Sequence, residues 1–208
     1  MLLVGAGCDQ GRAGTPGLKR NEAVLASGPS GAVQRDAASA AAAPGQARTR
    51  TLCAGAPLAR PLPAGRLAQA AAPGALPLGD RIVTPGAWTW ISLWAAWCKP
   101  CIDEIPRLLG WQTRLNGALR VRFLSLDDDE RQLRRMLESQ PAGGMRASHW
   151  LPEGRGRDAW LAAVGIKTEP TLPVQILVNP RGGVHCIVEG AIEDGDFERV
   201  AAIVQGRP

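Results

Sequence analysis

The sequence contains no tyrosine and only two phenylalanines, and no apolar run is long enough to form a membrane-spanning helix. Its lysines and arginines are mostly scattered arginines, and no run of them is long enough to predict a nucleic-acid groove. The net charge of +5 is therefore interpreted as an aid to solubility. Seven tryptophans carry most of the aromatic content, and a place in the core is their default interpretation.

Cysteine is also scarce. Five cysteines in 208 residues are too few for a disulfide-dense scaffold, and an odd number cannot pair completely within one chain. No second closely spaced pair accompanies Cys98 and Cys101, so only half of a zinc site is present. Covalent haem attachment needs histidine directly after the second cysteine, where this chain has Ile102. The apolar content of 45% predicts one globular domain plus an extension.

Two cysteines separated by two residues, Cys98 and Cys101, follow an aromatic and β-branched run at residues 88–94 that is typical of a buried strand. Apolar residues then recur at helical spacing from Ile102 to Leu109. The pattern predicts that Cys98 lies where a strand ends and a helix begins. The free N–H groups and positive dipole end of that helix would stabilise a thiolate, with help from the ammonium of Lys99. An inert structural disulfide is the alternative, although such a short loop makes a poor staple.

The segment WAAWCKPCIDEIP, residues 94–106, resembles the active-site segment of thioredoxin-like disulfide oxidoreductases, nearest to the envelope-facing TlpA/ResA type. The resemblance implies that Cys98 is the nucleophile, Cys101 resolves the mixed disulfide and Glu104 is a buried proton-handling group. Pro106 matches the family's helix-kinking proline. Ser92 stands where thioredoxin has a buried aspartate, which makes Glu104 the expected acid and base. The alternative for Glu104 is a surface carboxylate early in the helix.

The same resemblance implies a cis-proline beside the cysteines. Pro170 and Pro173 compete for this role, and we choose Pro173 because it directly precedes a predicted strand and lies six residues before Asn179. The backbone of Leu172 would then pair with an extended substrate. Pro100 would stiffen the turn between the cysteines. The predicted substrate-binding residues are Trp97, Lys99, Pro100, Leu172 and Pro173.

The resemblance implies a thioredoxin-like α/β fold, and periodicity and turn residues predict a mixed central sheet flanked by helices. The strands are expected at residues 88–94, 121–126, 147–151, 174–178 and 184–189. Helices are expected from Cys98 to about Asn116, after the aspartates at 127–129, at 157–164, and after Asp194 as an N-cap. The part from the second of these helices to the third resembles the helix-strand-helix insertion of the TlpA/ResA type.

Residues 9–77 are rich in Ala, Gly, Pro and Arg and predict a flexible, disordered tether, with the domain at residues 78–208. Residues 1–8 resemble the end of a bacterial lipoprotein signal, which implies a lipid anchor on Cys8; a start codon assigned too far downstream would explain its shortness. The alternative is an untethered N-terminus with a chance cysteine. Cys186 is either a small buried residue or the partner of Cys53 in a disulfide that pins the tether to the sheet.

The sequence thus predicts a thiol-disulfide oxidoreductase of the bacterial cell envelope, on its periplasmic side. The TlpA/ResA resemblance favours a reductase, for instance of cysteines that await haem during cytochrome c maturation. Its partners would be protein thiols or disulfides and an upstream electron donor, and its only redox group the Cys98–Cys101 pair. The alternative is a thioredoxin-fold copper-binding chaperone in which His149 and His185 complete a copper site.

Overall fold

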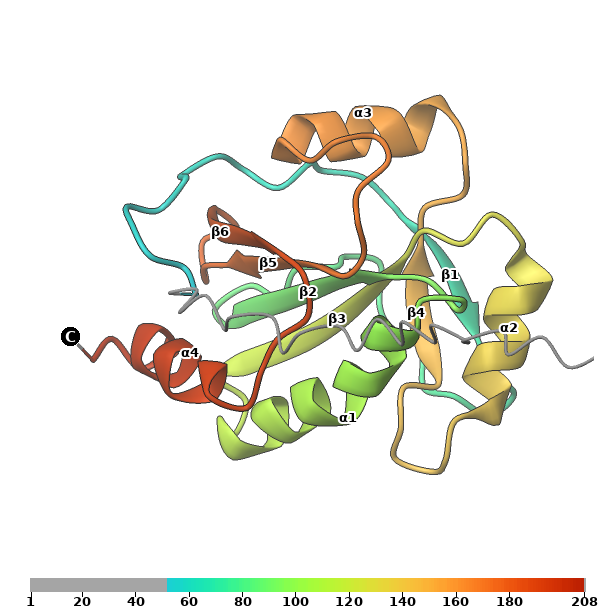
Figure 1. Cartoon of the computed structure of the whole chain (residues 1–208), viewed down its shortest axis with the longest axis horizontal. Helices are drawn as coiled ribbons and strands as arrows, with labels where there is room; N and C mark the ends of the chain where they lie inside the picture. Colours follow the sequence, from blue (N-terminus) through green and yellow to red (C-terminus); the bar gives the residue numbers. More distant parts are fainter. Residues whose placement is uncertain (1–51, 208) are drawn as a thin grey trace, which may run out of the picture. The chain divides into compact units, whose positions relative to one another are not determined.

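The computed structural model describes residues 52–207, and its centre is a mixed six-stranded sheet within that range (Figure 1). The strands lie in the order β1-β4-β3-β2-β5-β6. Strand β2 is parallel to β3, and β3 to β4, whereas the pairs β2–β5, β5–β6 and β1–β4 are antiparallel. Their bounds are β1 Ala68–Ala71, β2 Trp88–Trp94, β3 Leu119–Ser125, β4 Ala147–Trp150, β5 Val174–Val178 and β6 Val184–Glu189.

Four helices in the described residues cover the two faces of the sheet: α1 Lys99–Arg114, α2 Glu130–Ser139, α3 Arg155–Val164 and α4 Asp196–Val204. Buried side chains of α1, α2 and α4 share one core cluster, and those of α3 belong to a second. Figure 1 shows α1 and α4 below the sheet and α3 above it. The predicted mixed sheet with a terminal hairpin is confirmed. None of these helices is both long and apolar enough to span a membrane.

Strand β2 separates the two cores because successive side chains point to opposite faces of the sheet. Trp90 and Trp94 are fully buried on the α1 side, and Ile91 and Leu93 are fully buried on the α3 side. The core interpretation is confirmed for the largest buried tryptophans. Trp97 differs, with 63% of its surface exposed.

The sequence predicts a tether up to residue 77, and this prediction is wrong for the last part of that range. Leu52 is 1% exposed in the core, and β1 pairs with β4 along its whole length, from Ala68 opposite Trp150 to Ala71 opposite Ala147. Between Leu52 and β1, the backbone N–H of Leu58 donates to the carbonyl oxygen of His185. The packed part therefore begins at least as early as Leu52, not near Leu78. The alanine-rich sequence of β1 hides this because main-chain hydrogen bonds to β4, rather than large side chains, hold that strand.

Two predicted helix caps also differ. The N-cap of α4 is Gly195, while the carboxylate of Asp194 accepts a hydrogen bond from Arg107 on α1. Of the three aspartates before α2, only Asp129 caps the helix, by accepting from the N–H of Arg131 at 2.8 Å. Asp194 was mistaken for a cap because sequence spacing shows the acidic residue but not the distant arginine that binds it.

Candidate active site

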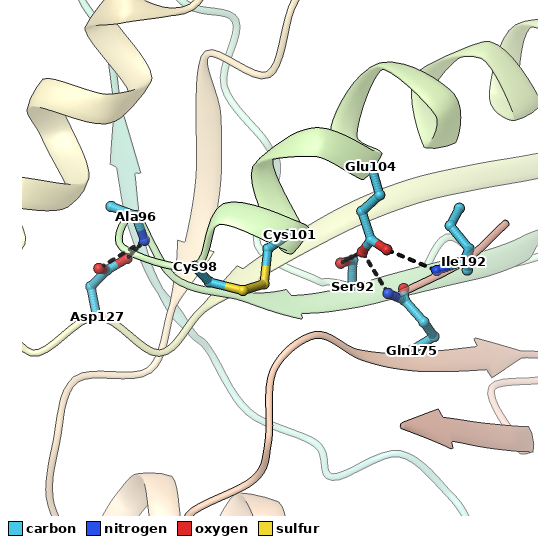
Figure 2. The surroundings of a disulfide bond; sticks show 8 residues. All are labelled: Ser92, Ala96, Cys98, Cys101, Glu104, Asp127, Gln175 and Ile192. Carbon is cyan, nitrogen blue, oxygen red and sulfur yellow. Dashed lines mark hydrogen bonds between the residues drawn. A yellow bond between two sulfur atoms is a disulfide. The ribbon is translucent and has the colours of Figure 1, made fainter. Parts of the chain in front are cut away.

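Cys98 and Cys101 lie at the junction of β2 and α1, as predicted, and are joined in a disulfide with 5.3 Å between their Cα atoms (Figure 2). Cys98 is the N-cap residue of α1, and its carbonyl oxygen accepts from the N–H of Ile102 at 3.1 Å. No acidic residue occupies the first turn of α1. The positive end of the helix dipole is therefore not neutralised from within that turn, which favours negative charge on Cys98.

Both cysteines are nearly enclosed in this oxidised form. Cys98 is 4% exposed and Cys101 is 1% exposed. Cys98 is enclosed in the disulfide state because it belongs to the same core cluster as Trp94. The residues that follow Cys98 are exposed, and Trp97 projects into solvent before it. Cys98 keeps the larger contact with solvent, in agreement with its predicted role as the attacking residue.

The ammonium of Lys99 is less available to a Cys98 thiolate than the sequence suggests. Its Nζ forms an ion pair with Asp103 at 2.8 Å, one helical turn along α1. The side chains of Lys99 and Asp103 are 82% and 59% exposed. Solvent and the paired carboxylate therefore screen this charge, and the helix N-terminus is the stronger source of thiolate stabilisation.

The peptide bond between Leu172 and Pro173 is cis, which confirms the choice of Pro173 over Pro170. Pro173 is buried and Leu172 is half-buried. The next residue, Val174, pairs with Leu93 near the end of β2. The cis-proline therefore lies at the same edge of the sheet as the cysteines. The pairing of the Leu172 backbone with a substrate stays a prediction.

Glu104 is buried, with 1% of its surface exposed, which excludes the surface-carboxylate alternative. Its Oε1 accepts from the hydroxyl of Ser92 at 3.1 Å and from Nε2 of Gln175 at 2.5 Å. Its Oε2 accepts from the N–H of Ile192 at 3.0 Å (Figure 2). Burial raises the pKa of Glu104 above its ordinary value, and the three hydrogen bonds and nearby Arg107 oppose that rise. A buried carboxyl group whose pKa is raised in this way is a candidate to accept and donate a proton.

Sequence reasoning missed Gln175, which is 1% exposed and is the second residue of β5. Its amide joins two buried groups, because its Oε1 accepts from the indole Nε1 of Trp90 at 2.8 Å while its Nε2 donates to Glu104. Gln175 lies directly opposite Ser92 in the sheet. The signal in the sequence was a single polar residue inside the apolar strand VQILV. Such a residue needs a buried partner.

Asp127 is a second residue that was missed. Its two carboxylate oxygens accept from the N–H of Ala96 at 2.9 and 3.0 Å, and Oδ2 also accepts from the hydroxyl of Ser125 at 2.7 Å. Burial raises the pKa of Asp127 above its ordinary value, against the lowering effect of these hydrogen bonds. Ala96 lies two residues before Cys98, so Asp127 anchors the loop that carries the cysteine (Figure 2).

The structure does not bring the two histidines together. His149 lies on β4 and His185 on β6, with β3, β2 and β5 between these strands. His149 is fully buried, and neither of its ring nitrogens has a hydrogen-bond partner among the described residues. The ring of His185 instead makes an edge contact with Trp88. The copper-binding alternative thus gains no support from this arrangement.

The two remaining described cysteines, Cys53 and Cys186, form a disulfide between the start of the described chain and β6. The pairing alternative is therefore correct. The bridge joins residues 133 positions apart, with 5.3 Å between the Cα atoms. Cys8, its predicted lipidation and the tether up to residue 51 lie outside the described residues.

Comparison with solved structures identifies the architecture. No protein-family model and no curated protein sequence matches the chain. The thiol:disulfide interchange protein DsbE assigned in Chlorobium tepidum matches with a TM-score of 0.53 and 20% identity, over 72% of this chain and 96% of that one. The thioredoxin domain of a Bacteroides vulgatus thiol-disulfide oxidoreductase matches with a TM-score of 0.50 and 21% identity, over 70% and 96%. The protein therefore has a thioredoxin-like fold.

Proposed function

We propose that this protein is a thiol-disulfide oxidoreductase that acts on other proteins through Cys98 and Cys101. The observation that carries the proposal is the position of this pair, at the N-terminus of α1 in a thioredoxin-like fold. The cis-proline at the same edge of the sheet and the buried acid Glu104 support it. An inert staple would need neither.

The reaction follows from thiol chemistry. In the reduced protein the Cys98 thiolate attacks one sulfur of a partner disulfide, and the other partner sulfur leaves as a thiolate. The Cys101 thiol then loses its proton to Glu104 and attacks Cys98 in the mixed disulfide. The second partner sulfur leaves, so the partner gains two electrons and the Cys98–Cys101 disulfide forms. An upstream dithiol returns two electrons to the pair, and oxidation of a partner runs the same steps backward.

The near-enclosure of Cys98 shapes how a partner is recognised. Because only 4% of Cys98 is exposed in the oxidised form, an incoming thiol must come into close contact with the rim of the site to reach it. The exposed indole of Trp97 and the half-buried Leu172 offer apolar contact beside it. An extended protein segment that pairs with the Leu172 backbone would place its own sulfur against Cys98. The expected substrate is therefore a flexible cysteine-containing segment.

We further propose that the protein is a TlpA/ResA-type reductase on the periplasmic side of the bacterial envelope, with a lipid anchor at Cys8. The Cys53–Cys186 disulfide supports an oxidising compartment, since structural disulfides persist there. Reduction of cysteines before haem attachment to cytochromes c is the proposed task. The direction of electron flow comes from the sequence resemblance alone, so it needs a measured potential.

An insulin-reduction assay tests the activity. The protein should catalyse reduction with dithiothreitol as the electron source, and Cys98→Ser should abolish it. Cys101→Ser should instead accumulate a mixed disulfide with a cysteine peptide, detectable by intact mass. A copper titration serves as the second arm. Absence of turnover together with tight stoichiometric copper binding would overturn the proposal in favour of the copper-binding chaperone, and a potential above that of glutathione would overturn the reductase assignment.

A further inference from the structure

The amide of Gln175 has only one orientation that satisfies its neighbours. The indole Nε1–H of Trp90 is a donor with no acceptor capacity, so the atom that it contacts at 2.8 Å must be the carbonyl oxygen of Gln175. The NH2 group must then face Glu104, at 2.5 Å from Oε1. A flip of the amide would leave two N–H donors facing each other at Trp90 and two acceptors facing each other at Glu104. Both sides of this chain are buried, which makes either mismatch costly.

Ser92 behaves differently although it contacts the same oxygen. Its hydroxyl can rotate about one bond and either donate or accept a hydrogen bond, so it does not fix the carboxyl group. The amide of Gln175 has no such freedom while Trp90 holds it. Gln175 therefore presents a donor to Oε1 whether or not Glu104 is protonated.

We propose that Gln175, locked by Trp90, is a positioning residue that holds the Glu104 carboxyl in one rotamer and reserves Oε2 as its proton-accepting atom. Oε1 already accepts two hydrogen bonds, which fills its two lone-pair directions. Among residues 52–207, Oε2 accepts from the N–H of Ile192 alone, which leaves one of its lone pairs without a donor from that part of the chain. This inference rests on the proposed function, in which Glu104 takes the proton of Cys101 during resolution.

The charged groups near Glu104 do not position its carboxyl group, so we assign this role to the amide of Gln175. On its own helix Arg107 is the charged group that acts on Glu104, and Arg107 is itself bonded to Asp194 and to the carbonyl oxygen of Ile192. Strands β2 and β5 contribute only the neutral side chains of Ser92 and Gln175. Removing the amide donor therefore removes the shortest hydrogen bond of the carboxylate without changing any charge.

The test uses Gln175→Met, Trp90→Phe and the double variant, with Trp94→Phe as the matched control. Trp94 lies on the same strand and face, but its indole donates to Ser148. The titration of Glu104 is followed by carboxyl-carbon NMR in the oxidised full chain, where neither active-site cysteine titrates. Gln175→Met should raise the proton affinity of Glu104 about tenfold, since a hydrogen bond to a charged group is lost. Trp90→Phe should raise it less, because the freed amide can turn its oxygen toward the protonated acid.

In the double variant the Trp90 change should add nothing, because Trp90 acts through Gln175. In stopped-flow measurements of mixed-disulfide resolution, the pH profile of Gln175→Met should move by the same amount. An unmoved Glu104 titration in Gln175→Met, an equal effect of Trp94→Phe, or a pH profile that does not follow the titration would each overturn the proposal. If the wild-type protein reduces no disulfide, the proposed function is wrong. The NMR titration of Glu104 would still test the orientation of Gln175 in that case. Near-ultraviolet circular dichroism verifies that each variant is folded.

Discussion

Removal of the Cys53–Cys186 disulfide should cost a large part of the stability of this domain. The bridge closes a loop of 133 residues, and the chain-entropy relation gives about 5 kcal/mol for a loop of this length at 25 °C. Observed losses for single bridges are commonly about 2–4 kcal/mol, so the calculated figure is a ceiling. The double variant Cys53→Ala/Cys186→Ala avoids placing a serine hydroxyl at Cys53, which is only 7% exposed. We expect it to unfold about 2–5 kcal/mol more easily.

Urea unfolding without reductant measures this difference, because the Cys98–Cys101 bridge stays oxidised in both proteins. In reductant the parent should fall to the level of the variant, since both then lack the Cys53–Cys186 bridge. A loss below about 1 kcal/mol with an unchanged denaturant slope would refute the reasoning. Intact mass after alkylation is an independent check in a variant that lacks Cys98 and Cys101. Alkylation of both Cys53 and Cys186 without reductant would show that the bridge is absent.

Three further outcomes are expected. After reduction, iodoacetamide should modify Cys98 well before Cys101, as peptide mapping would show; equal rates would contradict the proposed roles of the two cysteines. Burial lowers the pKa of His149 to about 4, so the stability that its neutral form provides above pH 6.5 is lost as the pH falls toward 4. Between pH 6.5 and pH 4, the free energy of unfolding of His149→Leu should fall by about 3 kcal/mol less than that of the parent protein, as measured by urea unfolding. An unchanged pH dependence would refute the lowered pKa of His149. Because burial raises the pKa of Glu104 above 4.5, stability should fall as pH rises from 4.5 through the folded-state pKa, and Glu104→Gln should flatten that slope. The same variant should slow the resolution of the mixed disulfide by about 100-fold or more in stopped-flow measurements, whereas a normal rate would exclude proton transfer by Glu104.

The sequence by itself determined the features that depend on neighbours in the chain. The strand-to-helix junction at Cys98 follows from the apolar run before it and the helical spacing after it, and the structure has both. Local pattern is enough for this junction because propensity and periodicity act over a few turns. The burial of Glu104 and the cis bond before Pro173 were instead implied by the family resemblance, and the structure has both.

Only the tertiary structure decided which distant residues meet. Gln175 and Glu104 are 71 positions apart, Asp127 and Ala96 are 31 apart, and each pair is a buried polar contact that no local pattern specifies. The strand at residues 68–71 was invisible for a related reason, since Ala-Gln-Ala-Ala has no strand signature and is held by its pairing with β4. The near-enclosure of Cys98 likewise depends on core packing around Trp94. Hydrogen bonds and burial of this kind exist only once the chain has folded, because they join groups that the sequence keeps far apart.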